Sequence, residues 1–248
     1  MDAAKIRLCV EHPLASGQTV PLERDQAHYL FGVMRLTEGS AVALFNGHDG
    51  EWQAEVTSAG KRGGELTCRS QSRPQAAPPD LWLLFAPIKK TRTDFIVEKA
   101  AEIGVARIQP VQTDFTNAER IRRDRLQAHA VEAAEQCGST YVTEVNDLAR
   151  LDRLLANWPA ERQLMFCDEA FAEASYGTPD GAPRPLGDAP RGPWAVLIGP
   201  EGGFSEAERK RLHALPFAWP VQLGPRILRA DTAAVAALTL WQLHLGDW

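Results

Sequence analysis

The segment QSRPQAAPPD, residues 71–80, constrains the fold of this chain more than any other stretch. Three of its ten residues are proline, which lacks a backbone N–H and has a fixed φ. Such a segment disfavours both helix and sheet and favours an extended linker. Because the hydrophobic pattern also differs on its two sides, we expect two domains, at residues 1–72 and 81–248, joined by a proline-rich linker at 73–80.

The part before the linker has the pattern of short strands with turn sequences between them. NGHDG at 46–50 and GKRGG at 60–64 supply the glycine, asparagine and aspartate that tight turns need. One helix is expected at about Arg24–Leu36. The expected strands are Lys5–Val10, Ser40–Asn46, Glu51–Ser58 and Glu65–Ser70. Together these elements predict a small domain similar to a β-barrel.

Beyond the linker, short apolar runs alternate with helix-like stretches. The expected strands are 81–86, 105–111, 162–167, 194–199 and 220–224, and the expected helices are Thr93–Ile103, Arg120–Cys137, Ser205–Ala214 and Thr232–Leu245. This alternation predicts an α/β domain with a mostly parallel sheet. Residues 173–192, rich in Gly, Pro and Ala, are expected to form a long loop.

The composition is that of a soluble globular protein, with 44% apolar and 24% charged residues. No apolar run approaches the roughly 20 residues of a membrane helix, and the start MDAAKIRLCV has no export signal, so we expect a cytoplasmic protein. The four cysteines and six histidines form no C-x-x-C pair or Cys/His cluster, which predicts reduced thiols and no metal site. The net charge of −5 disfavours nonspecific polyanion binding but permits a local basic face.

LIGPEGGFSEAE, residues 197–208, is the more informative of two glycine-containing motifs. Ser205 and Glu208 have the spacing of a capping box, which predicts a helix that begins at Glu206. Residues 199–204 would then connect a strand to a helix at the carboxyl end of the strand, where open α/β sheets bind ligands. The alternative is a tight turn that needs glycine for its backbone conformation alone.

The same loop lacks the features of a phosphate-binding loop. It does not match G-x-G-x-x-G or G-K-[ST], Pro200 has no N–H to donate, and Glu201 would repel a phosphate. The pattern favours a ligand with little or no phosphate and a positive charge. S-adenosylmethionine fits, because backbone groups can bind its adenine edge and its sulfonium tolerates a nearby carboxylate.

LGPRILRADTAAVAAL, residues 223–238, repeats this arrangement of an apolar strand, Gly-Pro and a helix. Asp231 or Thr232 marks the expected start of the helix, and its alanines permit close packing against another backbone. Arg226 and Arg229 flank an apolar pair. A single arginine of this kind is most simply a solvated charge, whereas two in a Gly-Pro loop that faces another Gly-Pro loop indicate a functional role.

Together, LIGPEGGFSEAE and LGPRILRADTAA strongly resemble the RsmE family, small-subunit ribosomal RNA uridine-N3 methyltransferases of the SPOUT superfamily. The resemblance extends along nearly the whole chain, through HYLFGVMRL…LFNGHDGEW, FAPIKK…DFIVEKAAEIGVARIQPV and VEAAEQCG. It implies a SPOUT-type trefoil-knotted α/β domain after a small PUA-like β-barrel domain that binds RNA. It also implies a homodimer whose sites lie near the subunit interface.

The activity implied by the resemblance is S-adenosylmethionine-dependent methylation of N3 of a specific uridine in 16S rRNA of the small ribosomal subunit. Transferred by position, the cofactor-binding residues are Cys167, Asp168, Glu169, Leu197, Ile198, Gly199, Pro200, Glu201, Gly202, Gly203, Leu223, Gly224, Pro225, Ile227 and Leu228. In the β-barrel, Arg7 and Arg35 match positions where the family carries arginine.

The reaction requires uracil N3 to lose its proton while charge is stabilised on the base. A positioned arginine suits this task, so Arg226 is the first catalytic candidate and Arg229 the second. Glu201 or Asp231 could accept the proton, although both could equally be structural. The target uridine must be single-stranded or flipped out of a helix.

Two basic clusters are candidates for contacts with RNA phosphates. Lys89, Lys90 and Arg92 directly follow a strand, which favours a functional role. For Arg120, Arg122, Arg123 and Arg125, a solvated helix face is about as good an interpretation.

The chain departs from the family pattern at Phe115, where the family usually has arginine, and at Ser139 and Thr140, where it commonly has Gly-Arg. These changes bear on RNA docking and leave the cofactor loops intact. The alternatives are therefore an RNA- or ribosome-binding factor with weak or no catalysis, and a methyltransferase that acts on another RNA.

Overall fold

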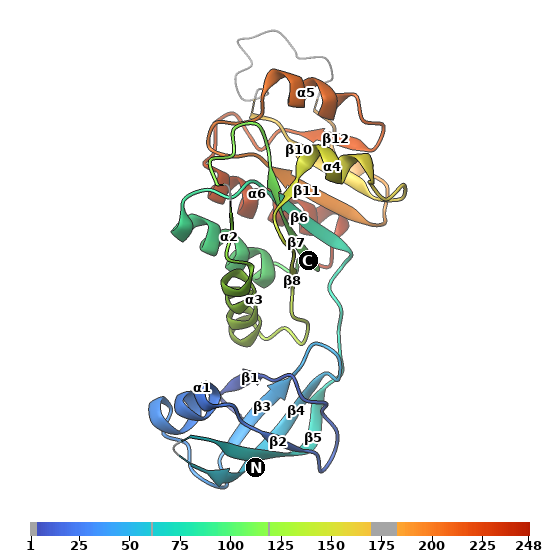
Figure 1. Ribbon diagram of the computed structural model, residues 1–248. Helices are drawn as coiled ribbons and strands as arrows, with labels where there is room; N and C mark the ends of the chain where they lie inside the picture. The colour runs from blue at the N-terminus through green and yellow to red at the C-terminus, as the bar shows by residue number, and fades with distance from the viewer. Residues whose placement is uncertain (1–3, 61, 119, 170–182) are drawn as a thin grey trace. The chain divides into compact units, whose positions relative to one another are not determined.

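The computed structural model describes residues 4–60, 62–118, 120–169 and 183–248 (Figure 1). The chain divides into two compact units. The smaller unit comprises residues 1–77 together with 134–142, and the larger unit comprises residues 78–133 and 143–248.

The smaller unit is built on one five-stranded sheet, in the order β1-β3-β4-β5-β2. Its strands are β1 (Arg7–Cys9), β2 (Thr19–Pro21), β3 (Ala41–Phe45), β4 (Glu51–Ala59) and β5 (Gly64–Arg73). The pairs are antiparallel, except that β1 lies parallel to β3. Four strands were predicted, and the three-residue strand β2 was missed. The predicted β-domain is thus confirmed.

The prediction of one continuous helix at Arg24–Leu36 is wrong. The segment begins as α1 (Arg24–Ala27) and continues as a π-helix, η1 (His28–Val33). The imidazole of His28 lies against Gly32, since a Cβ there would be 2.9 Å from His28 Nδ1. A residue without a side chain at position 32 therefore permits the wider turn.

The larger unit is built on a seven-stranded sheet in the order β12-β10-β11-β6-β7-β8, with β9 paired to β7, and all of its pairs are parallel. The strands are β6 (Leu81–Phe85), β7 (Arg107–Gln112), β8 (Glu144–Val145), β9 (Ala149–Arg150), β10 (Gln163–Cys167), β11 (Trp194–Ile198) and β12 (Ala218–Val221). The helices are α2 (Lys90–Glu102), α3 (Arg123–Cys137), α4 (Leu151–Ala156), α5 (Glu206–His213) and α6 (Ala230–Leu245). The predicted α/β fold with a mostly parallel sheet is confirmed.

Both faces of this sheet are covered, as is usual for parallel sheets. Alternate residues of β6 point to opposite sides: Leu83 packs with α2, α3 and α6, whereas Leu84 packs with α4 and α5. In β11, Val196 and Leu197 divide in the same way. The result is a three-layer unit in which the carboxyl ends of β10, β11 and β12 lie side by side (Figure 1).

Several element boundaries differ from the prediction. Strand β12 begins at Ala218 rather than Pro220, because it is the edge strand, where proline is tolerated. Helix α2 begins at Lys90, and Thr93 lies in its first turn with its hydroxyl bonded to the backbone of Ile88. Helix α3 begins at Arg123 rather than Arg120. The short elements β8, β9 and α4 were not predicted.

The predicted loop at 173–192 lies outside the described residues as far as position 182. The remainder contains a 3-10 turn, η3 (Leu186–Asp188), which anchors Leu186 in the core. Among the described residues, no helix is both long enough and apolar enough to cross a membrane.

Candidate functional site

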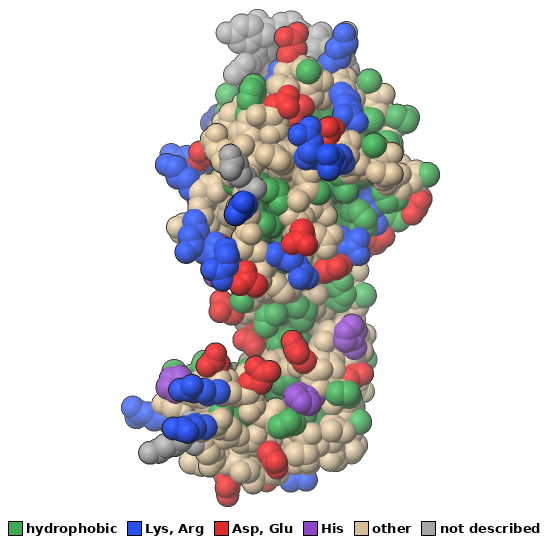
Figure 2. Space-filling view, in the orientation of Figure 1, with side chains coloured by type: hydrophobic (Ala, Val, Ile, Leu, Met, Phe, Trp, Pro, Cys, Tyr) green, Lys and Arg blue, Asp and Glu red, His purple; other side chains and the backbone are tan. Residues whose placement is uncertain are grey.

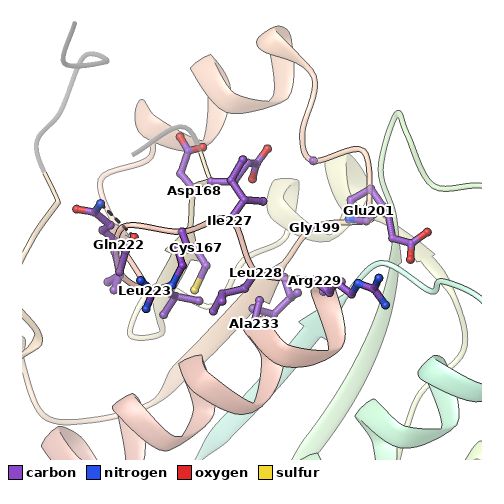
Figure 3. Close-up of a pocket in the computed structure, with 18 residues that line it drawn as sticks. Cys167, Asp168, Gly199, Glu201, Gln222, Leu223, Ile227, Leu228, Arg229 and Ala233 are labelled. Carbon is purple, nitrogen blue, oxygen red and sulfur yellow. Dashed lines mark hydrogen bonds between the residues drawn. The ribbon is translucent and has the colours of Figure 1, made fainter. Parts of the chain in front are cut away.

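A cavity of about 280 Å³ opens where the carboxyl ends of β10, β11 and β12 meet the start of α6 (Figure 3). Two segments form most of its wall: residues 199–203, the first glycine loop, and residues 222–229, the second glycine loop. Arg226 and Arg229 both line the cavity. So does every predicted cofactor-binding residue except Leu197, Gly202 and Pro225.

The structure adds lining residues that the motifs did not indicate. Val221, Gln222, Ala230 and Ala233 complete the wall. Ala233 was singled out only as part of a thin helix, and its methyl side chain leaves the cavity open above the first turn of α6 (Figure 3). Leu197 is absent from the wall because it is fully buried on the opposite face of the sheet, beside α5.

The first glycine loop is held tightly by its neighbours. Gly203 has a φ of 70°, and a Cβ there would be 2.0 Å from Glu169 Oε1, so that the carboxylate occupies the space of a side chain. The N–H of Phe204 donates to the same oxygen at 3.4 Å. The loop then enters α5 through the predicted capping box, in which Ser205 and Glu208 bond to each other's backbone. The prediction that α5 begins at Glu206 is confirmed.

The second glycine loop is much more open. Gly224 has a φ of 115°, and no heavy atom of the described residues lies within 4 Å of the position of a Cβ there. Ile227 is 60% exposed. Within the loop, Gln222 Nε2 donates to the carbonyl of Gly224 at 3.2 Å (Figure 3). The loop thus presents Arg226, Ile227 and Arg229 at the surface.

Helix α6 begins at Ala230, earlier than Asp231 or Thr232 had indicated. Arg229 occupies the N-cap position, and the Asp231 carboxylate accepts the N–H of Thr232 at 2.9 Å. A carboxylate in the first turn is favourable because the amino-terminal end of a helix carries partial positive charge. Asp231 is therefore a first-turn acid rather than the cap.

A buried charge cluster supports the end of β10. The Asp168 side chain is fully buried, and its carboxylate lies 2.8 Å from His213 Nε2 and 3.2 Å from Arg209 Nε. Arg209 Nη2 also lies 3.2 Å from Glu169 Oε1. Arg209 and His213 were missed by the sequence analysis. Their spacing of four residues places them on one face of α5, and this spacing was the only feature of the sequence that could have indicated a shared role.

Cys167, at the end of β10, lines the cavity as a neutral thiol. Burial, reinforced by the charges of Asp168 and Glu169, raises the pKa of Cys167 to about 12. A thiol with this pKa is protonated at neutral pH, so that it contributes an uncharged contact rather than a nucleophile.

Arg92 lies beside the first glycine loop. Its guanidinium forms an ion pair with Glu201 of the first glycine loop, and its Nε lies 3.6 Å from Asp231 Oδ2. Arg92 was predicted to contact RNA, but here two carboxylates are its partners. It joins α2 to the first glycine loop and to α6.

Phe115 is an exposed aromatic residue beside the first glycine loop. It is 49% exposed, and a Cβ at Gly202 would be 3.5 Å from the Cβ of Phe115. The adjacent Asp114 fixes this segment to α5: its N–H donates to Glu208 at 2.9 Å, and its carboxylate accepts the Ser205 hydroxyl at 2.5 Å. Phe115, the position at which the sequence analysis expected the family to have arginine, is thus held next to the first glycine loop.

In the smaller unit, Arg7 is occupied by internal contacts. Its guanidinium donates to Glu51 and to the carbonyls of Ala134, Glu135 and Ser139, and its side chain is only 15% exposed. Burial alone would raise the pKa of Glu51, but hydrogen bonds from Arg73, Arg7 and Ser72 outweigh it and hold that pKa at about 2. The guanidinium of Arg7 is therefore held by contacts within the smaller unit.

The other predicted contacts are more accessible. Arg35 is exposed and adopts a φ of 56°, in the left-handed region. Lys89 and Lys90 lie at the start of α2 and are exposed. Thr140, one of the departures from the family pattern, is buried and accepts the N–H of Ala76 at 3.1 Å.

Comparison with known proteins agrees with this architecture. A family described as RNA methyltransferase domain matches residues 75–242, and a family described as RNA methyltransferase PUA domain matches residues 22–67. The curated ribosomal RNA small subunit methyltransferase E of Rickettsia conorii is 26% identical, over 94% of this chain and 93% of its own.

Two solved structures resemble the whole chain. The ribosomal RNA small subunit methyltransferase E from Neisseria gonorrhoeae, bound to S-adenosyl methionine, has a TM-score of 0.85 and 28% identity, over 98% of this chain and 99% of its own. A putative methyltransferase from Legionella pneumophila, in complex with the cofactor SAM, has a TM-score of 0.84 and 27% identity, over 99% and 100% of the two chains. The chain therefore belongs to the RsmE family of RNA methyltransferases, with a PUA domain before its RNA methyltransferase domain.

Proposed function

We propose that this protein methylates N3 of a uridine in 16S rRNA of the small ribosomal subunit, with S-adenosylmethionine as methyl donor. The observation that carries the proposal is the cavity between the two glycine loops, which gathers the predicted cofactor residues with Arg226 and Arg229. The relatives named ribosomal RNA small subunit methyltransferase E support the choice of RNA.

The residues of this cavity suit S-adenosylmethionine. Ile198, Leu223 and Leu228 offer apolar surface for an adenine ring, and the glycine loops offer backbone donors and acceptors for its edge. The carboxylates of Glu169 and Glu201 also line the cavity, each paired with an arginine of the chain. When bound, S-adenosylmethionine supplies an electrophilic methyl group on its sulfonium.

The chain's own contribution to the reaction is to position uracil and stabilise charge. Loss of the N3 proton leaves negative charge on N3, O2 and O4 of the base. Arg226 and Arg229 lie at the cavity and are exposed, so that either guanidinium can face the base without moving a packed element. Charge fixed in advance of the reaction is often the largest catalytic contribution. We assign Arg226 the first place and Arg229 the second.

Two carboxylates were candidates for the proton acceptor. Glu201 and Asp231 are both ion-paired with the guanidinium of Arg92. Both carboxylates thereby favour a structural role, in which they position the first glycine loop and α6. Loss of the N3 proton to solvent is the simplest route that agrees with these contacts.

Recognition of RNA falls to both units in this proposal. The smaller unit contains the matched PUA segment and exposes Arg35. In the larger unit, Lys89 and Lys90 are the remaining cations of their cluster, since Arg92 is ion-paired within the protein. Phe115, exposed beside Gly202, offers a face on which an unpaired base can stack. Arg7 and Arg92 are assigned structural roles.

The domain boundaries at 72 and 80, the trefoil knot, the homodimer and the cytoplasmic location stay predictions from the sequence. The knot, in which the C-terminal segment would thread through a loop, is implied by the resemblance alone. A homodimer would place a second chain near this cavity.

The test is transfer of labelled methyl groups from S-adenosylmethionine to unmodified small ribosomal subunits, with the product identified by mass spectrometry. We expect one 3-methyluridine in 16S rRNA. Label on another RNA would favour a methyltransferase of different specificity. Tight cofactor binding with no label on any RNA tested would favour an RNA- or ribosome-binding factor.

A further inference from the structure

The larger unit has a second cavity, of about 330 Å³, that the proposed function does not use. It lies between the start of α2 and the segment that leads into α3. Four cations line it, Lys90, Arg120, Arg122 and Arg125, above an apolar floor that includes Ile88 and Ile121. The two basic clusters of the sequence, thirty residues apart, thus meet at one place. Figure 2 shows Lys and Arg side chains gathered near the start of α2.

The four cations differ in how far they are neutralised. Arg125 is paired with Asp94 through two contacts of 3.0 and 2.6 Å. Arg122 lies 2.8 Å from Asp124, but both side chains are about 70% exposed, at 74% and 68%, so that the pair is screened by water. Among the residues that the structure describes, Lys90 and Arg120 have no carboxylate within ion-pair distance. Among the described residues, the lining of this cavity therefore carries more cations than carboxylates paired with them.

A further feature of the cavity favours an anion. The first turn of α2 contains no acidic residue but carries Lys90 and Arg92. The amino-terminal end of a helix is already partly positive, and Lys90 adds a charge there that no described carboxylate pairs with, which favours an anion.

The second cavity also lies close to the first glycine loop. One turn of α2 serves both places: Lys90 lines the second cavity, and Arg92 forms the ion pair with Glu201 of the first glycine loop. A single strand whose target base enters the cofactor cavity can therefore place a neighbouring phosphate at Lys90. A volume of this size suits one nucleotide rather than a duplex.

We propose that this cavity binds one nucleotide of the substrate RNA strand next to the target uridine. Lys90 and Arg120 contact its phosphate, and Ile88 and Ile121 pack against its sugar. This inference rests on the proposed function, because it names the site at which the same RNA is held.

The test compares two double variants that lose the same charge. The first double variant, Lys90→Ala with Arg120→Ala, removes the two cations of the cavity that have no described carboxylate partner. In the control, Arg150→Ala and Arg153→Ala remove two cations near α4, outside this cavity. Affinity for a single-stranded oligouridine is measured by fluorescence anisotropy over a series of KCl concentrations. S-adenosylmethionine binding is measured on each variant by calorimetry.

For a single strand, each neutralised phosphate contributes about 0.7 to the slope of log K against log salt, so we expect a reduction of about 0.7 for Lys90→Ala with Arg120→Ala, which together contact one phosphate. The affinity should fall at least tenfold at low salt, and the control should keep the wild-type slope. Lys90→Arg with Arg120→Lys should restore the slope. Equal slopes for the two double variants, or a wild-type slope in the first, would overturn the site.

The cofactor measurement separates this result from failure of the proposed function. If the function is wrong, the wild-type protein itself lacks S-adenosylmethionine binding or methyl transfer. If only this site is wrong, the wild type binds cofactor and methylates RNA, and the cavity variant does so with unchanged RNA affinity.

Discussion

The two glycine loops of the cofactor cavity have similar sequences but very different surroundings. The first glycine loop is fixed by Glu169, by Arg92 and by the capping box of α5. The second is largely exposed, and apart from the two chain neighbours of Gly224 no described atom lies within 4 Å of a Cβ at that position. This difference indicates a division of labour, in which the first loop sets the shape of the cavity and the second presents Arg226 and Arg229 to the substrate.

The largest expected effect is on turnover, from the second loop. Arg226→Ala should lower the rate constant for methyl transfer about 10²–10³-fold, as expected for loss of one preorganised charge-stabilising group. The dissociation constant for S-adenosylmethionine should stay nearly unchanged, because the shape of the cavity depends on the first loop. Single-turnover kinetics and calorimetry measure the two quantities.

Arg153→Ala, on α4, is the control for loss of a cation elsewhere in the larger unit. A fall in cofactor affinity as large as the fall in rate would contradict the division of labour, since Arg226 would then belong to the cofactor-binding wall.

The second effect is on stability, from the charge cluster behind the first loop. Asp168→Ala leaves Arg209 and His213 without their buried carboxylate. Removing one partner of a buried ion pair costs about 3 kcal/mol or more in the free energy of unfolding. Urea denaturation measures this change.

The matched control is Asp152→Ala, because Asp152 forms an exposed ion pair with Arg150. Its midpoint of unfolding should stay close to that of the wild type. If both variants unfold at the same denaturant concentration, Asp168 does not support the cavity in the way the contacts indicate.

The third effect is on cofactor affinity, from the first loop itself. Gly203→Ala forces a residue with a side chain into a φ of 70° and displaces the Glu169 carboxylate. The left-handed conformation alone costs about 1–2 kcal/mol, so we expect S-adenosylmethionine to bind roughly 5–30-fold more weakly.

Gly187→Ala is the neutral control, because no described atom lies within 4 Å of a Cβ at that position. Wild-type affinity in Gly203→Ala would show that the first loop is as adaptable as the second and would remove the contrast between them.

The smallest effect concerns Cys167, between the two loops. Its pKa of about 12 means that it stays protonated at pH 8.5, whereas the exposed Cys137 is available to reagents. Iodoacetamide at pH 8.5, followed by peptide mass spectrometry, should modify Cys137 much faster than Cys167. Because the folded-state pKa exceeds the ordinary 9.0, this thiol should lower stability only as the pH rises above about 9. Equal labelling rates would show that the wall between the loops is open to solvent.

Local chemistry explains how much of the site was predictable. Both glycine loops were predicted from patterns that depend only on the local backbone conformation. These patterns are the Gly-Pro pairs, the spacing of Ser205 and Glu208, and the apolar runs before the loops. Apolar alternation likewise revealed the parallel sheet. The strands β2, β8 and β9 were missed because two or three residues are too few to show a repeated alternation, whereas β1, equally short, lies within the longer alternating run of residues 5–10.

Contacts made by long side chains between distant elements were not predictable. Arg92 looks like a solvent-facing cation beside two lysines, and its pairing with Glu201 depends on how α2 packs against the sheet. Arg209 and His213 reach Asp168 only because α5 folds back over β10. The π-helix at 28–33 depends on the fit of His28 over Gly32, which no propensity records.

The most direct test is to fill the cofactor cavity with a large side chain on α6. Ala233 lines it from α6, whereas its exposed neighbour Thr232 does not. Calorimetric titration with S-adenosylmethionine should show binding to the wild type and to Thr232→Phe, and at least 100-fold weaker binding to Ala233→Phe at an unchanged melting temperature. Wild-type affinity in a folded Ala233→Phe variant would place the cofactor elsewhere and contradict the assignment of this cavity.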